Sequence, residues 1–560
     1  MHKHDTYKTS VRVALLLLAI TLILSTTIIL VANNVIAQST INEVKKVISS
    51  EGLDHPFDVL VYKNENNETI AITNRGFIVA SGLDDTSVIQ KAIEKVYSDG
   101  GGTVFIKKAV YEIKTTIKLY PGVKIKSDGA ILKLSSEFTP KGGSDTNRAV
   151  LMNAAFYNLE DVNEEDYWIE GLVINGNKNN RTPPTGREKE IGIAILRFNG
   201  DGASKVIQHV VIKDVTIKNV YGHGIHLWSV RDFTIENVRI ESVGYEGDNL
   251  WNGLYIAYCS YGEVRNVKAN TEDYMGVKIV HCEKLTFIDV ISECNRMNAF
   301  CIADEPSRDL TFIKCIGRNS TYGFYLKNNN ERLTFIDCIA EFNLQRGWCI
   351  LETNSSEFIN IKAINNSQTA ANSYDAIYLA YSCKNKIINA IIQGPHLRGV
   401  NEDVGCDENE ITIHEVSGAS SPFKRTGRKT IIRYYMHSVT VRQWANVPIG
   451  TSDNYGDLVE LKSITSMLVN PRVGFVISGI NATASEVITV KIEFVYSDNV
   501  SVSIEKSFTS DGEYWLDDSD YYALYRDASA DKWIVSVKLY AKSNLDSTAA
   551  TVTGRLYAYG

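Results

Sequence analysis

Apolar residues recur at a regular interval through the middle of the chain, and this repeat predicts the architecture. The segment Leu-Thr-Phe-Ile, followed by a polar or charged residue and Val or Cys, begins at Leu285, Leu310 and Leu333, 25 and 23 residues apart. A second element, a Gly before two apolar residues that flank a variable one, recurs in step. It begins at Gly224, Gly253, Gly276, Gly323 and Gly347. Such a period predicts coils stacked along one axis, with each strand pairing in parallel with the next coil about 4.8 Å away.

Two features narrow this repeat to one fold. The Leu-x-x-Leu-x-Leu signature of leucine-rich repeats, which share the period, is absent. Ile, Val and Phe at alternate positions fill a shared interior, because no single coil can bury its apolar face alone. The sequence therefore predicts an all-β fold, a right-handed parallel β-helix, over residues 83–420.

The residues that begin this region follow a helical pattern instead. Ile89, Ile93 and Val96 share one helix face, between Asp84 and a run of Gly at 100–102. Asp is a favoured N-cap, and Gly ends helices. We expect a capping helix that covers the first coil, whose apolar end is otherwise exposed. Residues 38–82 are assigned to a linker and N-terminal entry strands.

The repeat stops near Gly418, and a different strand pattern follows. Residues 487–496 and 533–540 alternate apolar and polar positions, and turn residues such as Asp511-Gly512 separate strands of this kind. This spacing predicts a C-terminal β-sandwich over residues 430–560. Its role is either that of a cap or spacer, or that of a module for carbohydrate binding or self-association.

The N-terminal segment indicates the compartment. Residues 13–32 are twenty residues without a charge, long enough to cross a bilayer, and Lys3, Lys8 and Arg12 precede them. Residues 1–37 are therefore interpreted as a cytoplasmic stub and transmembrane anchor, with an extracellular body. A cleaved signal peptide, which makes the protein secreted, is the alternative. Seven Asn-x-Ser/Thr sequons agree with an exported glycoprotein.

Composition excludes some functions. Lys plus Arg number 58 and Asp plus Glu number 66, so the formal net charge is −8. A nucleic-acid-binding protein needs a basic face, so nucleic acid is not an expected partner. With 44% hydrophobic and 22% charged residues, the chain is expected to be folded rather than disordered.

The first coils also resemble a known group of proteins. Residues 83–129, LDDTSVIQKAIEKVYSDGGGTVFIKKAVYEIKTTIKLYPGVKIKSDG, are similar to the N-terminal signature of the pectate lyase superfamily, in particular its rhamnogalacturonase and epimerase-like β-helix proteins. The resemblance covers roughly residues 75–420. It implies the fold, and an activity among polysaccharide lyases, glycoside hydrolases, epimerases, viral tailspikes and non-catalytic surface proteins.

The glycosidase motifs of that superfamily do not transfer to this chain. Polygalacturonases are expected to carry Asn-Thr-Asp-Gly, Asp-Asp, Gly-His-Gly and Arg-Ile-Lys in this order. Here Gly222-His223-Gly224 comes first, Asn270-Thr271-Glu272-Asp273 follows, and Arg-Ile-Lys is missing. Lyase chemistry of the superfamily implies an Arg or Lys base and carboxylates that hold Ca²⁺ against the acid group of a uronate.

The aligned strands contain one dense group of candidate functional residues. In the strands that begin with Gly, the variable residue points outward, which places His226, Tyr255, Lys278, Cys301, Tyr325, Cys349 and Tyr378 in one row. The candidate catalytic residues are His223, Lys278 and Asp273. The candidate substrate-binding residues are His226, Trp228, Trp251, Asn252, Tyr255 and Tyr325. The candidate Ca²⁺ ligands are Glu246, Asp248 and Glu272.

Each candidate also has a structural interpretation. His223 between two Gly residues fits an ordinary turn, and outward Tyr side chains can stack along a ladder for stability alone. The carboxylates can equally be solvated turn residues. No zinc-ligand cluster, phosphate loop or Gly-x-Ser-x-Gly elbow is present in the sequence.

The nine Cys residues all lie between positions 259 and 406. Cys315 and Cys338 replace Val290 of the preceding coil, so we expect them to point inward and stay reduced. Cys259 and Cys282 also align, and an oxidising compartment makes a disulfide between them plausible.

Two functional classes remain open from the sequence. The first is an extracytoplasmic protein that binds or processes acidic polysaccharide, as a lyase, hydrolase or epimerase if it is an enzyme. The second is a non-catalytic surface or virion fibre that binds glycans. Expected partners are a polysaccharide or cell-surface glycan, the membrane through the N-terminal helix, and a second copy of the chain.

Overall fold

The computed structural model describes most of the chain beyond residue 55. The described residues are 56–143, 148–183, 190–198, 206–245, 251–294, 296–424, 426, 430–434, 440–447, 449–450, 459–478, 480, 483, 485–496, 501–516, 534–544 and 551–559. The expected anchor at 13–32 lies outside them. Among the described helices, none combines the length and apolar character needed to cross a bilayer.

The N-terminal end of the β-helix is closed by a small antiparallel sheet and one helix. The elements are β1 (Val59–Lys63), β2 (Thr69–Thr73), β3 (Ile78–Gly82) and α2 (Asp85–Ser98). The Asp84 side chain caps α2 by accepting a hydrogen bond from the Ser87 N–H at 3.4 Å. The helix buries Val88, Ile89, Ile93 and Val96 against the first coil, which confirms the expected capping helix.

Asp85 ties this cap to the first coils. Its carboxylate accepts hydrogen bonds from the Thr69 hydroxyl at 2.5 Å and the Glu112 N–H at 2.6 Å, and it lies 3.0 Å from Lys63 Nζ. Asp85 is buried, so these partners compensate the loss of its hydration. The sequence pattern gave Asp85 no role beyond that of a helix-start residue.

Parallel strands form three faces around the helix axis. The first face is a 12-stranded sheet, called sheet B. Its strands are β6 (Ile117–Leu119), β9 (Arg148–Asn153), β12 (Glu190–Leu196), β15 (Ile225–Trp228), β17 (Asn252–Ala257), β19 (Met275–Val280), β22 (Asn298–Ile302), β25 (Tyr322–Leu326), β29 (Trp348–Leu351), β33 (Ile377–Ala380), β35 (Arg398–Glu402) and β37 (Ser421–Lys424).

The other two faces belong to one larger sheet, called sheet A, because its long strands run through the corner between them. One face holds β4 (Gly102–Ile106), β7 (Val123–Ser127), β10 (Glu164–Glu170), β13 (Ile207–Lys213), β16 (Val230–Val243), β18 (Ser260–Thr271), β20 (Glu283–Ile288), β23 (Thr311–Ile313), β27 (Thr334–Ile336), β31 (Glu357–Ile359), β34 (Lys386–Gln393), β36 (Glu410–Ser417) and β38 (Ile431–Tyr434). The other adds β5 (Val110–Thr115), β8 (Ile131–Thr139), β11 (Val173–Asn175), β14 (Thr216–Lys218), β21 (Ile291–Cys294), β24 (Ile316–Arg318), β28 (Ile339–Glu341) and β32 (Lys362–Ile364). Short elements at the corners are α3 (Ala154–Asn158), η1 (Lys178–Asn180), β26 (Asn330–Glu331) and β30 (Thr353–Asn354).

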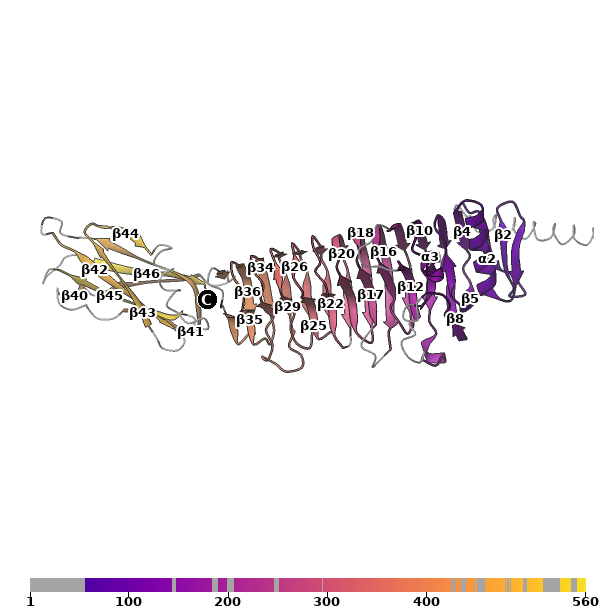
Figure 1. The fold of residues 1–560 in the computed structure, drawn as a ribbon. Helices are drawn as coiled ribbons and strands as arrows, with labels where there is room; N and C mark the ends of the chain where they lie inside the picture. The colour runs from indigo at the N-terminus through magenta and orange to yellow at the C-terminus, as the bar shows by residue number, and fades with distance from the viewer. Residues whose placement is uncertain are drawn as a thin grey trace, which may run out of the picture.

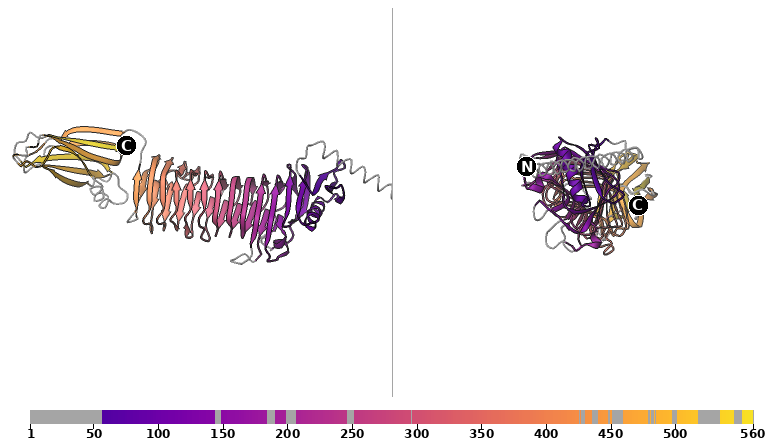
Figure 2. Two further views of the ribbon diagram at one scale, coloured as in Figure 1. Left: turned by 90° about the horizontal axis from the view of Figure 1, so that it is seen from above. Right: turned by 90° about the vertical axis from the view of Figure 1, so that its right-hand side faces the viewer.

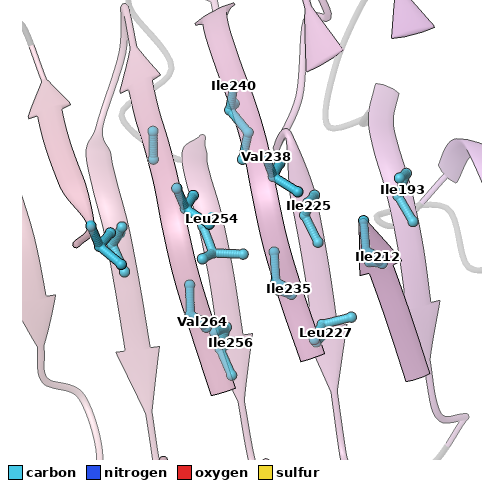
Figure 3. Packing of buried hydrophobic residues seen from close by; sticks show 14 of the residues in the cluster. Ile193, Ile212, Ile225, Leu227, Ile235, Val238, Ile240, Leu254, Ile256 and Val264 are labelled. Carbon is cyan, nitrogen blue, oxygen red and sulfur yellow. The ribbon is translucent and has the colours of Figure 1, made fainter. Parts of the chain in front are cut away.

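The interior is a continuous apolar column. Ile225, Leu227, Leu254 and Ile256 of neighbouring sheet B strands are fully buried, and Figure 3 shows them packed with residues of sheet A. In later coils Phe rings stack directly on one another. Ring centroids are 4.7 Å apart for Phe287 and Phe312, 4.6 Å for Phe312 and Phe335, and 5.0 Å for Phe335 and Phe358. The coil period therefore aligns identical side chains as predicted.

Polar corners are satisfied by ladders of short side chains. Asn343 Nδ2 donates to Asn366 Oδ1 at 2.7 Å, and Asn366 Nδ2 donates to the Ala340 carbonyl at 3.0 Å. Such buried side chains satisfy backbone groups where the chain turns and no strand partner is present.

The stack of coils is elongated, as two perpendicular views show, and compact when viewed along its length (Figures 1 and 2). The C-terminal strands follow it as a separate group of β-strands (Figure 1). They are β39 (Thr440–Val447), β40 (Ile449–Gly450), β41 (Val459–Ser478), β42 (Ile488–Tyr496), β43 (Ser501–Phe508), β44 (Gly512–Trp515), β45 (Ile534–Ser543) and β46 (Thr551–Tyr559). Their pairing is antiparallel except between β40 and β45.

Candidate functional site

The outward row predicted on sheet B is present in the structure. His226 pairs with Tyr255, Tyr255 with Lys278, Lys278 with Cys301, and Cys301 with Tyr325. The flanking apolar residues point into the interior column, whereas Cys301 and Tyr325 pack in a separate cluster with Met275. Register and side-chain direction are therefore both as the period predicts.

Aromatic rings form a connected patch at the start of this row. The His226 ring stacks on Tyr255 with centroids 4.5 Å apart and an angle of 16° between the planes. Trp228 contacts the Tyr255 ring edge-on at 6.3 Å and the Tyr258 ring at 4.9 Å. Burial, with a further contribution from the charge of Asp304, raises the pKa of Tyr255, so its phenol keeps its proton at neutral pH.

Lys278 continues the patch and carries its positive charge. Its side chain is 12% exposed, and Nζ lies 2.6 Å from Asp304 Oδ2. The ammonium also lies 5.5 Å from the centroid of the Tyr255 ring and 5.8 Å from that of Tyr274. The charge is therefore held between two rings and one carboxylate, of which Asp304 is 62% exposed.

Four of the candidates are buried, which corrects the expectation that they line an open surface. His223 is 1% exposed, His226 2%, Trp251 2% and Asn252 1%. His223 Nδ1 accepts a hydrogen bond from the Asn252 N–H at 2.8 Å, so that nitrogen is occupied by the neighbouring coil. The His223 ring also contacts Trp251 and Tyr255 at 5.2 Å each. The His223 ring therefore packs against Tyr255 of the outward row and is itself covered by its neighbours.

Asp273 is likewise buried, with no exposed surface. Its Oδ2 accepts the Trp251 N–H at 3.1 Å, and its Oδ1 lies 3.8 Å from Arg296. A carboxylate that holds a backbone N–H of the preceding coil fixes a turn. In this structure Asp273 cannot touch a ligand on the outer face of sheet B.

Of the three expected Ca²⁺ ligands, only Glu272 lies among the described residues. Glu272 accepts a hydrogen bond from Lys178 Nζ at 2.5 Å, so a lysine already compensates its charge. Glu246 and Asp248 lie outside the described residues. Within the described ranges, no three His, Cys, Asp or Glu side chains are grouped as a metal site.

Tyr325 lies two coils beyond Lys278 in the same row and is half-buried. Its ring packs on Tyr322 at 5.6 Å, and burial raises its pKa to about 12. Cys301, between Lys278 and Tyr325, is buried, and burial raises the pKa of its thiol to about 12. Cys301 is therefore a packed thiol and not an activated nucleophile.

A cavity of about 380 Å³, which the strand period does not predict, lies at the corner where sheet B meets sheet A. Its lining includes Arg197, Arg231, Tyr258, His281, Glu283 and Arg308. Tyr258 and His281 occupy the corner position three residues after Tyr255 and Lys278. Their φ angles of 55° and 48° are left-handed, as is that of Asp304 at 75°. We call Tyr258 and His281 the corner column. The sequence does carry a signal for it, because each of these residues follows an outward residue of sheet B by three positions.

The corner column is linked to the row on sheet B. The Tyr258 ring lies 5.1 Å from that of His281, and its hydroxyl donates to Glu305 Oε1 at 2.5 Å. Glu305 Oε2 lies 3.3 Å from His281 Nδ1. Aromatic rings thus run without a break from His226 through Trp228 to the cavity.

The thiols aligned as expected, and all nine Cys residues are free in the structure. Cys315 and Cys338 are fully buried in the interior. Cys282 Sγ accepts the Cys259 N–H at 3.4 Å, and Cys259 Sγ accepts the Val230 N–H at 3.4 Å. Cys259 and Cys282 therefore accept backbone hydrogen bonds at the corner of the coils, and they do not form a disulfide in the structure.

Comparison with known proteins identifies the fold of the central region. Residues 194–367 match the family model of the right handed β-helix region. This match covers about a third of the chain, and together with the parallel pairing of successive coils it shows that the region is a right-handed parallel β-helix.

Several individual proteins are similar to the chain. The mannuronan C5-epimerase AlgE1 of Azotobacter vinelandii is 28% identical over 212 residues, which are 35% of this chain and 13% of that protein. The A-module of the mannuronan C-5 epimerase AlgE6 from the same organism has 15% identity and a TM-score of 0.45, covering 64% of this chain and 96% of that one. The N-terminal fragment of gene product 12 of bacteriophage Phi29 has 11% identity and a TM-score of 0.43, covering 66% and 73%.

Proposed function

We propose that the protein binds an acidic polysaccharide along the outer face of sheet B. The observation that carries this proposal is the pair of part-exposed Trp228 and Tyr255 rings, with the buried His226 ring stacked on Tyr255, beside the Lys278 ammonium on consecutive coils. Aromatic rings offer flat apolar surface to sugar rings, and a few fixed polar groups give orientation. Coils about 4.8 Å apart repeat this surface along the axis, which suits a polymer.

The ion pair of Lys278 supports an acidic ligand. Asp304 supplies a carboxylate to the ammonium at 2.6 Å from a position that is largely exposed. A uronate carboxylate is the same chemical group, so it can replace Asp304 without leaving Lys278 unpaired. Exchange of one carboxylate for another avoids the cost of a partly buried, uncompensated charge.

A second candidate function is proton abstraction from a uronate, as in an epimerase or a lyase. Lys278 would neutralise the sugar carboxylate, which acidifies the proton at the adjoining carbon. His226 would take the C5 proton, and the Tyr255 phenol, which its raised pKa keeps protonated, would give a proton to C5 in epimerisation or to the departing glycosidic oxygen in elimination. The similarity to a mannuronan C5-epimerase over 212 residues favours this candidate, and the 2% exposure of His226 weighs against it.

The proposed site of action is outside the cytoplasm. This follows from the apolar segment 13–32, the cations before it and the seven sequons. If the segment remains as an anchor, the full-length protein fractionates with membranes and resists extraction by high salt. Recovery of a soluble exported form that begins near Gln38 would identify a signal peptide instead.

Binding and catalysis are separated by one set of measurements. Titration calorimetry with polymannuronate, polyguluronate and polygalacturonate oligomers measures binding. Absorbance of unsaturated products measures elimination, and deuterium uptake from the solvent at C5 measures proton abstraction. Binding without either reaction identifies the non-catalytic protein, while absence of binding to every oligomer contradicts the proposal.

Variants then locate the surface. Tyr255→Ala and Lys278→Met should each weaken binding about tenfold. Tyr381→Ala and Lys384→Met are matched controls, because both residues are exposed on a distant coil. Equal effects of the two sets would remove the binding site from sheet B.

A further inference from the structure

A second group of aromatic and cationic side chains lies on sheet B, beyond Lys278. Its cation is Arg346, which directly precedes the strand pair of residues that leads into β29, and β22 and β25 separate β29 from the β19 strand of Lys278. Three coil steps of about 4.8 Å place the two cations about 14 Å apart along the axis. Arg346 and the four tyrosines around it are all partly exposed, and we call these five residues the arginine patch. The tyrosines are Tyr322, Tyr325, Tyr374 and Tyr378.

The tyrosine rings hold the Arg346 guanidinium on the outer face of the sheet. Its central carbon lies 4.3 Å from the centroid of the Tyr378 ring and 6.0 Å from that of Tyr374. Tyr378 belongs to the outward row, so the guanidinium that covers its ring is on the outer face as well. On the preceding coil, the Tyr322 and Tyr325 rings stack with centroids 5.6 Å apart. A guanidinium that packs flat on an aromatic ring keeps the N–H donors at its edge for a ligand.

The positive charge of Arg346 is not paired within the described ranges of the chain. No carboxylate oxygen there lies within 4.0 Å of its guanidinium, and its buried Nε has no hydrogen-bond acceptor. The guanidinium interacts with the Tyr322 hydroxyl, a neutral group that leaves the charge uncompensated. On the same coil, Glu352 stands at the other end of β29. Lys278 differs in this respect, because Asp304 already lies 2.6 Å from it. A carboxylate can therefore bind Arg346 without displacing another one.

The carboxylates on the coils that follow have cations of their own. Asp375, in register with Arg346 on the next coil, is buried and lies 3.5 Å from Arg398. Asp403, one coil further, lies 3.6 Å from Lys424. Both carboxylates are thus compensated without Arg346, and this group of three cations and two carboxylates keeps an excess of positive charge.

The surface between the two cations suits an extended chain. The outward row from Lys278 to the arginine patch continues through Cys301 and Tyr325. Cys301 is a small, buried side chain, and the Tyr325 ring is half-buried. A polymer that follows the row therefore meets a low surface and then an aromatic face before it reaches Arg346.

We infer that the arginine patch is a second binding site for a uronate, in which the planar guanidinium of Arg346 donates two parallel hydrogen bonds to the sugar carboxylate and the tyrosine rings contact the sugar. This inference rests on the proposed function and extends it. One chain along sheet B places one uronate at Lys278 and another at Arg346, about 14 Å further on. The surface therefore selects chains long enough to contact both cations at once.

The test compares variants of the two cations with a matched control. Arg346→Met removes the charge and the donors, whereas Arg346→Lys keeps the charge but not the planar fork. Lys384→Met is the control, because Lys384 is 66% exposed and follows β33 at the same end of the β-helix, outside the strands of sheet B. Calorimetry uses a long polymannuronate, polyguluronate or polygalacturonate oligomer, its disaccharide and its carboxyl-reduced neutral form. Melting temperatures check that all variants are folded.

We expect Arg346→Met to bind the long uronate oligomer about tenfold more weakly, with unchanged affinity for the neutral oligomer. Arg346→Lys should recover part of this loss, and Lys384→Met should bind like the parent. The disaccharide, which is too short to contact both cations, should lose less affinity than the long oligomer.

Three results would overturn the second site while leaving the glycan surface intact. They are an unchanged affinity of Arg346→Met for the long oligomer where Lys278→Met weakens it, an equal loss for the neutral oligomer, and an equal loss for the disaccharide. Failure of the parent to bind any oligomer would instead refute the glycan surface and the second site together.

Discussion

Lys278 and Asp304 form an ion pair of 2.6 Å on the outer face of sheet B, although they lie on neighbouring coils and their exposures differ fivefold, 12% against 62%. The lysine is fixed between the Tyr255 and Tyr274 rings, whereas the aspartate stands at a corner with a left-handed φ of 75°. A fixed cation paired with an exposed carboxylate is the arrangement that an incoming carboxylate can replace.

Removal of the Asp304 charge should therefore strengthen binding. Asp304→Asn leaves Lys278 without its carboxylate and removes a repulsive charge, so affinity for a polyuronate oligomer should rise up to about fivefold. The gain should shrink as salt increases, because the site is near the surface. Calorimetry at two ionic strengths measures both effects. Asp309→Asn, which removes the exposed partner of Arg332, is the control. An unchanged affinity would show that Lys278 does not contact the ligand.

The interior Phe column predicts a large and local stability effect. Phe335→Ala removes a fully buried ring that lies 4.6 Å from Phe312 and 5.0 Å from Phe358. The free energy of unfolding should fall by about 3–5 kcal/mol, through lost transfer energy and the cavity that remains. Phe342→Ala is the matched control, since this ring is 46% exposed and its loss should cost within about 0.5 kcal/mol. Equal costs in denaturant melts would contradict the alignment of the coils.

A buried histidine predicts a dependence of stability on pH. His396 has no exposed surface, its Nε2 lies 3.2 Å from the Gln393 carbonyl, and burial lowers its pKa. The unfolded chain then binds the proton more readily than the folded one, so the free energy of unfolding falls as pH drops below about 6.5. His396→Gln should remove this slope, while His209→Gln, at an exposed position, should retain it. Identical slopes in the parent and His396→Gln would show that His396 is not responsible.

Much of the fold follows from the sequence because the coil period fixes the register. Once Gly253 and Gly276 are aligned, Tyr255 must pair with Lys278, and the alternation of a strand decides which side chains face outward. The capping helix was equally accessible, because Asp84 and the Gly run mark its ends.

Exposure at the site was not predictable in the same way. His223, Trp251 and Asp273 lie in turns, where no period sets the path of the chain, and each is covered through hydrogen bonds to a neighbouring coil. The cavity was missed for a related reason. Arg197 and Arg308 approach the same corner from separate coils, and only the packed structure shows that they line one space.

The cysteines give the last prediction, and here the structure differs from the disulfide that an exported location favours for Cys259 and Cys282. Both thiols accept backbone N–H groups of the preceding coil, and burial raises the pKa of Cys259 well above its usual range. A disulfide would withdraw these acceptors from Val230 and Cys259, and a buried thiol with a raised pKa forms little thiolate to attack. We therefore expect both to remain reduced, as for Cys315 and Cys338. Alkylation of the folded protein without reductant should leave these four thiols unmodified, and alkylation after unfolding should label all nine. A 259–282 or 315–338 linked peptide in the mass spectrum would refute the reduced column.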